Sequence, residues 1–420
     1  MTDLATNLCG LKLRTPFVLA SGPLSFDGDA LVRAHRAGAG AVVTKTVGAQ
    51  AAVNLVPHIA RSSGGLLNAE RWSDLPAERW IEREIPRARK AGAVVIASVG
   101  LTREDVRTLA AALAEAGASA LEIVSYDGTA LPGMVEEAAS LASVPVFAKV
   151  SANWPDVAAI ARACLTSGAS AITAIDSLGP ALRFDLASRR PRLEGYGWLS
   201  GRPILPIALR VVADIARETG CPIVGTGGVA TADEAVEMLY AGASAVGVCT
   251  APLLRGVSVF GDLVRGLSAR LSSLGFESAV EATGAGLPGL VGASNRTKTR
   301  EGWRFTWSRE ICTDCGACVR VCPYGARRST EVVAEGDCRG CGLCAASCPT
   351  GALLLLQGGG GPSPAERRAP SREGGPARRR ASPCARGPCA GGAGPVLEGR
   401  GIIEENDTRW SSEGDGHAVQ

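Results

Sequence analysis

Eight cysteines between residues 312 and 349 have a spacing that can hold iron–sulfur clusters. Two segments, C-T-D-C-G-A-C-V-R-V-C-P at 312–323 and C-R-G-C-G-L-C-A-A-S-C-P at 338–349, share the pattern C-x2-C-x2-C-x3-C-P. In this pattern three thiolates of one segment bind one cluster, and the fourth cysteine binds the other cluster. Zinc knuckles or disulfides would not require this repeated register or the proline after each fourth cysteine. We therefore predict two 4Fe-4S clusters, one on Cys312, Cys315, Cys318 and Cys348 and the other on Cys338, Cys341, Cys344 and Cys322.

Small and polar residues follow the apolar runs of the first 250 residues, and two of these polar residues are lysines. Lys45 follows A-V-V-T, and Lys149 lies near the end of P-V-F-A-K-V. Burying an unpaired ammonium group is costly, so a purely structural lysine here would need a carboxylate partner. Beside a flavin, the same group would stabilise negative charge on the reduced ring.

A short phrase recurs before the cysteine region and indicates which elements position these residues. It reads A-G-A-G-A-V at 37–42, A-G-A-S-A-L at 116–121, S-G-A-S-A-I at 167–172 and A-G-A-S-A-V at 241–246. Each copy follows an alanine-rich segment with helical spacing and precedes a β-branched run, as expected for a helix-to-strand joint. Helices are visible at 103–117, 155–168 and 231–242. Strands are predicted near 17–20, 41–44, 93–98, 120–125, 145–150, 170–175, 222–226 and 244–248.

Eight alternating βα units favour a TIM (β/α)8 barrel over an open doubly wound sheet, which typically has five or six strands. In such a barrel the chemistry lies at the C-terminal ends of the strands. The segments G-T-G-G-V at 225–229 and G-V-C-T-A at 247–251 suit a phosphate site there, because glycines expose backbone N–H groups. FMN is the phosphate ligand predicted, since it exchanges hydride with a substrate and single electrons with clusters.

Composition excludes several functional classes. The chain has 420 residues with 53 glycines, 46% hydrophobic and 4% aromatic residues, which suits an α/β interior of small aliphatic side chains. Its net charge is +3, without a basic stripe interleaved with aromatics, so no nucleic acid partner is expected. No apolar run reaches the length of a membrane span, and no signal segment is visible. We expect a cytoplasmic protein with no membrane association.

The domain organisation predicted is a barrel over 1–290, a polar bridge over 291–310, a small ferredoxin-like cluster domain over 311–356 and a tail over 357–420. The tail is rich in Gly, Pro and Arg, which predicts disorder. The segment G-A-G-L-P-G at 284–289 spells G-x-G-x-x-G, but no strand precedes it and Pro288 interrupts it. No nicotinamide-binding fold is therefore expected.

Several motifs in order resemble a known family over roughly residues 5–350. They are L-A-S-G-P-L-S at 19–25, V-V-T-K-T at 42–46, G-L-L-N-A-E at 65–70, A-K-V-S-A-N at 148–153, G-W-L-S-G-R-P-I-L-P-I-A-L at 197–209 and G-T-G-G-V at 225–229. They are similar to the barrels of class 1 dihydroorotate dehydrogenases and dihydropyrimidine dehydrogenases. The two-cluster segment resembles that of the bacterial NAD-dependent dihydropyrimidine dehydrogenase catalytic subunit.

The resemblance implies an FMN-binding barrel in which a pyrimidine ring stacks on the flavin and a loop residue handles a ring proton. It also implies which residues contact the cofactor, with Lys45 as a catalytic residue and Asn68 facing the substrate. Further substrate contacts are expected from Asn153, Asp176 and Ser177. The cofactor residues implied are Ala20, Ser21, Lys45, Thr46, Lys149, Ser200, Gly201, Gly227, Gly228, Cys249 and Thr250.

The acid/base loop departs from the family pattern. After the fourth strand the family has N-x-S-C-P-N or a close variant, whereas this chain has E-I-V-S-Y-D-G. Asp127 aligns best with the missing acid/base residue, and Ser125 and Tyr126 are the alternatives. An asparagine after the sixth strand is likewise replaced by Asp176, so the resemblance implies the flavin site but does not identify the substrate.

The leading hypothesis is an FMN and iron–sulfur oxidoreductase that acts on a CH–CH bond of a dihydropyrimidine or of dihydroorotate. The alternatives are the same machinery acting on another conjugated C=C substrate, and an electron-transfer subunit without its own turnover. A partner subunit carrying FAD and an NAD(P) site is expected, because two one-electron clusters would serve no purpose for a direct hydride acceptor. An oligomer is also expected. The docking face predicted for the partner comprises Arg320, Arg327, Arg328 and Arg339.

Overall fold

The computed structural model describes residues 2–290, 303–334 and 336–357. The chain forms two compact units, the first comprising the described residues up to 290 and the second those from 303 onward. Most of the bridge predicted over 291–310, and the tail from 358 onward, lie outside the described residues.

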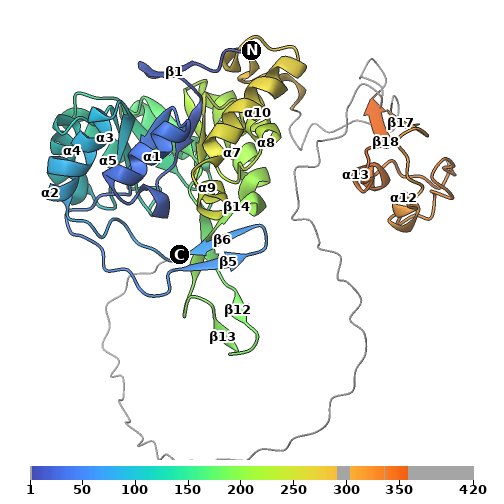
Figure 1. Ribbon diagram of the computed structural model, residues 1–420, viewed down its shortest axis with the longest axis horizontal. Helices are drawn as coiled ribbons and strands as arrows, with labels where there is room; N and C mark the ends of the chain where they lie inside the picture. Colours follow the sequence, from blue (N-terminus) through green and yellow to red (C-terminus); the bar gives the residue numbers. More distant parts are fainter. Residues whose placement is uncertain (1, 291–302, 335, 358–420) are drawn as a thin grey trace, which may run out of the picture. The chain divides into compact units, whose positions relative to one another are not determined.

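The first unit is built around a closed barrel of eight parallel strands, as predicted (Figure 1). The barrel closes where Gly247 of the last strand pairs with Val18 of the first. All of these strands are short and mostly buried, because helices cover the outside and side chains fill the inside. In chain order they are β3 (Phe17–Leu19), β4 (Ala41–Val43), β7 (Val94–Val99), β8 (Ala120–Val124), β9 (Val146–Val150), β10 (Ala171–Ala174), β15 (Ile223–Thr226) and β16 (Ala245–Val248).

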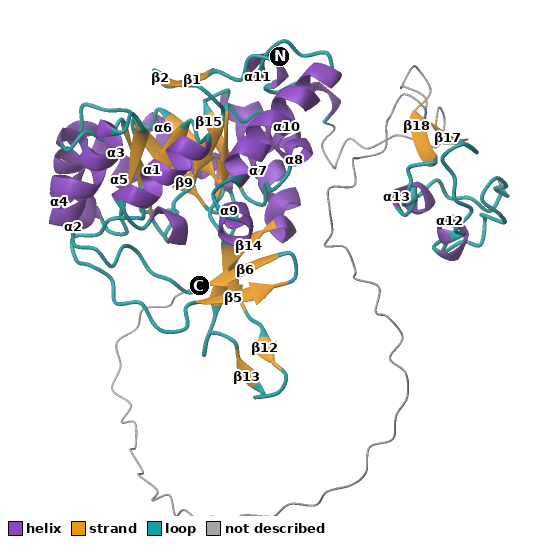
Figure 2. Ribbon diagram, viewed as in Figure 1, coloured by secondary structure: helices purple, strands orange, loops and turns teal. Residues whose placement is uncertain are grey.

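Helices alternate with these strands and pack around them (Figure 2). Their start signals follow from the sequence, since Thr102 and Thr231 cap two of them in capping boxes with Asp105 and Glu234. The longer helices are α1 (Gly28–Ala37), α4 (Arg103–Glu115), α5 (Leu131–Leu141), α6 (Val157–Thr166), α7 (Leu205–Thr219), α8 (Ala232–Tyr240) and α10 (Val259–Ser273). The short ones are α2 (Ala77–Arg79), α3 (Ile85–Lys90), α9 (Thr250–Arg255) and α11 (Ala279–Ala282).

The two ends of the barrel are finished differently. At one end a hairpin of β1 (Thr6–Leu8) and β2 (Leu11–Leu13) buries Leu8 and Leu13 against inward-facing residues such as Val18 and Phe147. At the other end a four-stranded antiparallel sheet lies beside the ends of the barrel strands, in the order β11–β14–β6–β5 (Figure 1). Its strands are β5 (Ile59–Ser62), β6 (Gly65–Asn68), β11 (Leu178–Ala181) and β14 (Gly197–Gly201), and a hairpin of β12 (Phe184–Asp185) and β13 (Arg190–Pro191) extends beyond it.

The second unit contains the cysteine motifs. Strands β17 (Trp303–Trp307) and β18 (Leu353–Gln357) pair antiparallel, so a strand lies within the segment expected to be a bridge. Helices α12 (Ala317–Arg320) and α13 (Leu343–Ala346) each carry the third cysteine of a motif, Cys318 or Cys344. Both of these cysteines are buried against Leu353. No helix in the described ranges of either unit is long and apolar enough to cross a membrane.

Candidate functional site

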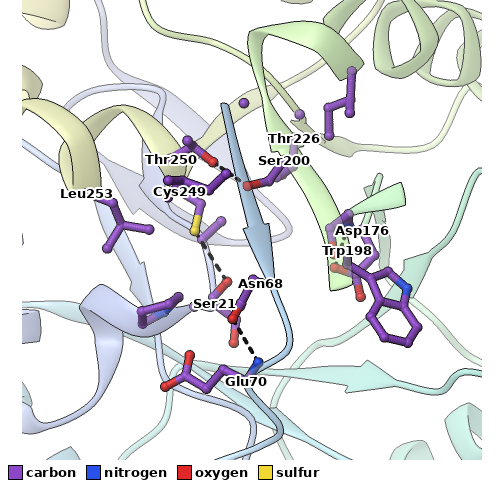
Figure 3. Close-up of a pocket in the computed structure, with 18 of the residues that line it drawn as sticks. Ser21, Asn68, Glu70, Asp176, Trp198, Ser200, Thr226, Cys249, Thr250 and Leu253 are labelled. Carbon is purple, nitrogen blue, oxygen red and sulfur yellow. Dashed lines mark hydrogen bonds between the residues drawn. The ribbon is translucent and has the colours of Figure 1, made fainter. Parts of the chain in front are cut away.

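A cavity of about 740 Å³ opens at the C-terminal ends of the barrel strands, beside β6 and β14 (Figure 3). This volume lies within the range of small-molecule and cofactor pockets. Most of the residues predicted for cofactor and substrate contact line it, although they come from the ends of six barrel strands and from the antiparallel sheet beside them. They are Ala20, Ser21, Lys45, Thr46, Asn68, Lys149, Asp176, Ser177, Ser200, Gly201, Gly227, Gly228, Cys249 and Thr250.

One wall of the cavity requires glycine. Gly227 and Gly228 follow β15 with φ values of 132° and 87°, a region that side chains strongly disfavour. A Cβ atom on Gly227 would lie 2.7 Å from Ala208, and one on Gly228 would lie 2.7 Å from Leu205. Close packing against Ala208 and Leu205 therefore requires glycine at both positions. Their bare backbone also lines the cavity, where N–H groups suit a phosphate oxygen.

Hydroxyl groups continue this wall. Thr250 Oγ1 lies 2.8 Å from Ser200 Oγ, which joins the start of α9 to β14 (Figure 3). The Cys249 thiol lies 3.8 Å from the carbonyl oxygen of Ser21, and burial raises its pKa to about 11. Cys249 is thus a neutral, small wall residue at neutral pH and not a nucleophile.

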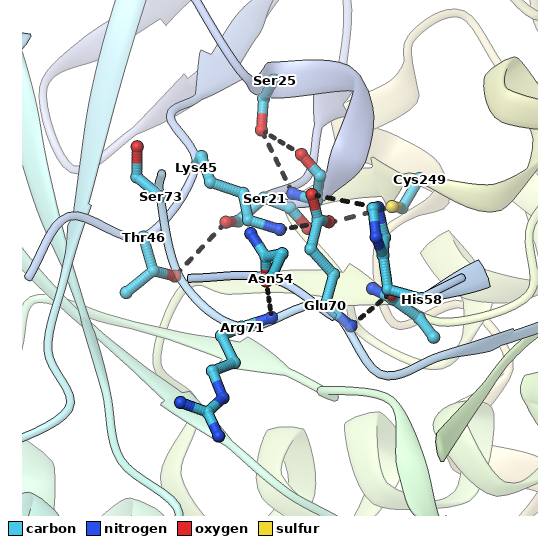
Figure 4. Close-up of polar contacts among 12 residues, drawn as sticks. Ser21, Ser25, Lys45, Thr46, Asn54, His58, Glu70, Arg71, Ser73 and Cys249 are labelled. Carbon is cyan, nitrogen blue, oxygen red and sulfur yellow. Dashed lines mark hydrogen bonds and ion pairs between the residues drawn. The ribbon is translucent and has the colours of Figure 1, made fainter. Parts of the chain in front are cut away.

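Lys45 is buried and forms an ion pair with Glu70, a carboxylate that the sequence did not single out (Figure 4). Burial lowers the pKa of Lys45, and the nearby Lys149 acts in the same direction, while the Glu70 carboxylate opposes both. His58 Nε2 lies 4.0 Å from the other oxygen of Glu70. The pair lines the cavity, so the Lys45 ammonium can respond to charge that develops on a bound ring.

Lys149 has a different set of partners. Its Nζ lies 3.2 Å from Asp176 Oδ1, and the buried Glu122 is a second carboxylate near it. Burial disfavours the charged form of Lys149, but the two carboxylates outweigh this effect and raise its pKa. Lys149 therefore keeps a fixed positive charge over the accessible pH range, whereas the pKa of Lys45 is lowered.

Glu122 lies inside the barrel with one oxygen bonded to Thr173 Oγ1 at 2.9 Å and the other without a hydrogen-bond partner among the described residues. Burial raises its pKa. Its nearness to Lys149 compensates for part of the cost of burying a carboxylate. Glu122 thus belongs to the layer beneath the cavity, from which it supports Lys149.

The loop after β8 is divided between two cavities. The Tyr126 ring lines the main cavity and stacks on Trp198, with 6.0 Å between ring centroids. Ser125 and Asp127 line only a neighbouring cavity. Asp127 Oδ1 accepts hydrogen bonds from the hydroxyl and the backbone N–H of Thr129 at 2.7 and 2.8 Å, which lower its pKa. The acid/base role predicted for Asp127 and Ser125 therefore gains no support from their position, because local turn bonds hold Asp127 outside the main cavity.

Two of the substrate residues expected also have structural roles. Asn153 does not line the main cavity, and its Oδ1 accepts a hydrogen bond from the Gly179 N–H at 3.4 Å. Asn68 does line it, but its Oδ1 accepts from the Glu70 N–H at 2.8 Å (Figure 3). Because an amide oxygen can accept two hydrogen bonds, this contact leaves one acceptor position and the NH2 group of Asn68 for a ligand.

In the second unit the eight cysteines surround two small cavities in the crossed arrangement predicted from their spacing. One cavity is lined by Cys312, Cys315, Cys318 and Cys348. The other is lined by Cys322, Cys338, Cys341 and Cys344. In each set the fourth cysteine comes from the other sequence motif, as two bound 4Fe-4S clusters require.

Comparison with known proteins agrees with this geometry. The family model described as dihydroorotate dehydrogenase matches residues 3–271, and models described as 4Fe-4S binding domain match 304–326 and 331–354. The chain belongs to the dihydroorotate dehydrogenase family. It is a dihydroorotate dehydrogenase-type oxidoreductase with two 4Fe-4S binding motifs.

Relatives within the family carry the name dihydroorotate dehydrogenase B (NAD(+)), catalytic subunit. The protein of Pyrococcus abyssi is 34% identical over 299 residues, which is 68% of this chain and 99% of the relative. That of Methanothermobacter thermautotrophicus is 34% identical over 307 residues, covering 67% of this chain and 97% of the relative. That of Bacillus caldolyticus is 33% identical over 301 residues, covering 68% and 96%. None of these three is named a dihydropyrimidine dehydrogenase, and nearly the whole of each matches only about two thirds of this chain.

For this dihydroorotate dehydrogenase family member, one part of the predicted docking face is corrected. Arg320, Arg328 and Arg339 are exposed, but Arg327 is only 3% exposed and lines the cavity of the second cysteine set. In the sequence Arg327 lies as near to the cysteines as Arg320, Arg328 and Arg339 do, so nothing sets it apart. The fold of the turn that follows Cys322 is what buries it. Arg327 is therefore unavailable to a docking partner.

Proposed function

We propose that the protein is an FMN and iron–sulfur oxidoreductase that interconverts dihydroorotate, or a related dihydropyrimidine, and the corresponding pyrimidine. The cavity carries this proposal, since it combines a bare glycine wall with two lysines at strand ends. A phosphate-bearing flavin fits both features, because Gly227 and Gly228 can approach its phosphate and Lys45 can face its ring. FMN, when bound, accepts hydride from the substrate and passes on single electrons.

Three side chains of the cavity have a role in this proposal. Lys45 would stabilise negative charge where the reduced ring lies, and Lys149 would supply a permanent positive charge on the same wall. Tyr126 would hold the proton that moves to or from the substrate ring. Partial desolvation of its hydroxyl and the nearby Asp176 carboxylate raise its pKa, so the phenol stays protonated to higher pH than an ordinary tyrosine. Such a phenol would donate a proton when the C=C bond is reduced, and the same group would accept a proton when dihydroorotate is oxidised.

Arg71 bears on the choice of substrate. Its side chain lines the cavity and extends away from the Lys45–Glu70 pair (Figure 4). Within the described part of the chain no carboxylate pairs with its guanidinium, and its charge reaches the Tyr126 hydroxyl. An unpaired arginine beside an aromatic wall suits a flat ring with an anionic substituent. We therefore favour dihydroorotate over the uncharged dihydrouracil and dihydrothymine.

Anaerobic mixing of the flavin-loaded full-length chain with each substrate tests this function. Dihydroorotate should bleach the flavin fastest, and Arg71→Ala should reduce that advantage over dihydrouracil. Arg61→Ala is the matched control, because Arg61 lines the outer part of the same cavity on β5. If none of the three substrates bleaches the flavin, the proposed function is wrong. A fast reaction with dihydrouracil alone would keep the flavin chemistry and overturn the role of Arg71.

The glycine wall predicts a specific loss of cofactor. Gly228→Ala should weaken FMN binding at least about tenfold, because the new Cβ combines a disfavoured φ with a contact to Leu205. Gly220→Ala is the control, since Gly220 also has a positive φ of 64° but no atom within 4 Å of a Cβ position. The flavin released on acid extraction, per chain, measures the effect. Equal flavin content in both variants would contradict the assignment of the phosphate wall.

The lowered pKa of Lys45 predicts a pH dependence. Its protonated form is the active one, so the rate of flavin reduction should fall as pH rises. The fall should begin at lower pH than the ordinary lysine value of 10.5 would give. In Lys45→Arg the fall in rate should begin at higher pH, because a guanidinium stays protonated. Stopped-flow reduction rates across pH 6 to 10, about the range in which flavoproteins are handled, check this; a rate that rises throughout would contradict it.

A partner subunit is part of the proposal. Purified chain mixed anaerobically with NADH alone should keep its flavin oxidised, since no strand precedes the G-x-G-x-x-G segment at 284–289 and a 3-10 turn interrupts it. Adding an FAD- and NAD(P)-binding electron-transfer protein should permit bleaching, more slowly at high salt if Arg320, Arg328 and Arg339 steer docking. Rapid bleaching by NADH without any partner would show that the chain has its own nicotinamide site.

A further inference from the structure

The two cysteine-lined cavities of the second unit differ in charge. The cavity of Cys322, Cys338, Cys341 and Cys344 has two arginines in its wall, the buried Arg327 and the exposed Arg339. The wall of the other cavity has no charged side chain among the described residues, and its non-cysteine members are residues such as Trp307, Thr330 and Ala352. The sequence motifs are alike, so this difference arises from what packs around them.

Arg327 is held in place by several contacts. Its Nη1 donates to the carbonyl oxygen of Thr330 at 2.8 Å, and its Cζ lies 5.4 Å from the centre of the Phe305 ring. Burial raises the pKa of the Cys344 thiol and the nearby guanidinium opposes this rise, while the Arg327 backbone N–H lowers the pKa of Cys322. Its Nε is buried without a hydrogen-bond partner among the described residues. A buried guanidinium with an unused donor beside cysteine sulfurs is costly unless negative charge faces it.

We propose that Arg327 raises the reduction potential of the cluster held by Cys322, Cys338, Cys341 and Cys344 above that of the other cluster. This rests on the proposal that both cysteine sets hold 4Fe-4S clusters. One electron entering that site adds one negative charge and changes no covalent bond, and a nearby buried cation stabilises the added charge. Arg339 lines the same cavity, and Arg320 Nη1 donates to the Cys315 carbonyl oxygen at 2.7 Å, but both side chains are exposed, as is that of Arg328. Water and salt therefore screen these three charges more than that of the buried Arg327. Arg327 thereby makes its site the one that receives the first electron.

An anaerobic redox titration of the full-length chain, followed by electron paramagnetic resonance, tests the proposal. The native chain should show two separate midpoint potentials. Arg327→Gln should lower the midpoint potential of the more readily reduced site by about 59 mV, which is about a tenfold change in the equilibrium of a one-electron couple. The midpoint potential of the other site should not change. Arg327→Lys should retain most of the separation. Arg328→Gln is the control with the same charge change, since Arg328 is exposed and paired to Asp337 at 3.1 Å.

Iron content separates this proposal from the one on which it rests. If Arg327→Gln keeps its iron and the higher potential does not move, Arg327 does not tune the site. If that variant fails to hold iron, single cysteine substitutions in the otherwise native chain show which cluster is reduced first. Cys341→Ser should alter or remove the signal reduced first, and Cys315→Ser should alter only the signal reduced second; the reverse pattern would overturn the proposal. A native chain without iron would instead refute the cluster assignment.

Discussion

Replacing Lys45 by alanine should slow reduction of the flavin by substrate about 10²- to 10³-fold, which corresponds to about 3 to 4 kcal/mol of lost electrostatic stabilisation. Lys45 is buried in the wall of the cavity, where a charge acts more strongly than in water. The iron content should remain unchanged, because the cysteine motifs belong to a separate unit. Single-turnover stopped-flow measurements with dihydroorotate give the rate.

The loss of Lys45 leaves the Glu70 carboxylate without its ion-pair partner, and that effect must be separated from catalysis. The double variant Lys45→Ala/Glu70→Gln removes both charges and should be as slow as the single variant. Recovery of the native rate in the double variant would show that the unpaired Glu70, and not the missing ammonium, caused the defect. An unchanged rate in Lys45→Ala itself would remove Lys45 from the mechanism.

Replacing Tyr126 by phenylalanine should slow turnover about 10²- to 10⁴-fold, the usual contribution of a positioned proton donor or acceptor. The ring can still stack on Trp198, so binding of substrate and flavin should persist. Exchange of solvent deuterium into the C5 position of the dihydropyrimidine ring should disappear as well. This exchange reports the proton transfer separately from the redox step.

Asp127→Asn is the informative comparison for Tyr126. The Asp127 carboxylate is bonded to Thr129 outside the main cavity, so Asp127→Asn should affect the loop but leave proton exchange unchanged. Should Asp127→Asn abolish exchange while Tyr126→Phe retains it, the acid/base assignment would be reversed. The original alignment of Asp127 with the family residue would then be correct.

The barrel was predictable because its signals are local. The repeated A-G-A-S-A phrases mark helix-to-strand joints, and the apolar runs after them became strands within one or two residues of the ranges expected. The capping box at Thr231 likewise placed the start of α8. The cysteine sets were predictable for the same reason, since in this motif the fourth cysteine of each copy binds the cluster of the other copy.

The sheet beside the barrel mouth and the partners within the cavity were not predictable in this way. Strand β14 pairs with β6 across more than 130 residues of sequence, and no local pattern indicates that pairing. The Lys45–Glu70 pair joins a strand end to the segment after β6, so Glu70 reads as an ordinary surface residue in the sequence. The local bonds of Asp127 were not predictable either, because alignment by position cannot show an Asx-type turn in which its carboxylate bonds to Thr129.

The cofactor content of the full-length chain, purified anaerobically, tests the central claim most directly. Acid extraction and metal analysis should give about one FMN and about eight irons per chain, from one barrel site and two cysteine sets. Absence of flavin would contradict the barrel assignment, and zinc in place of iron would contradict the assignment of the cysteine cavities.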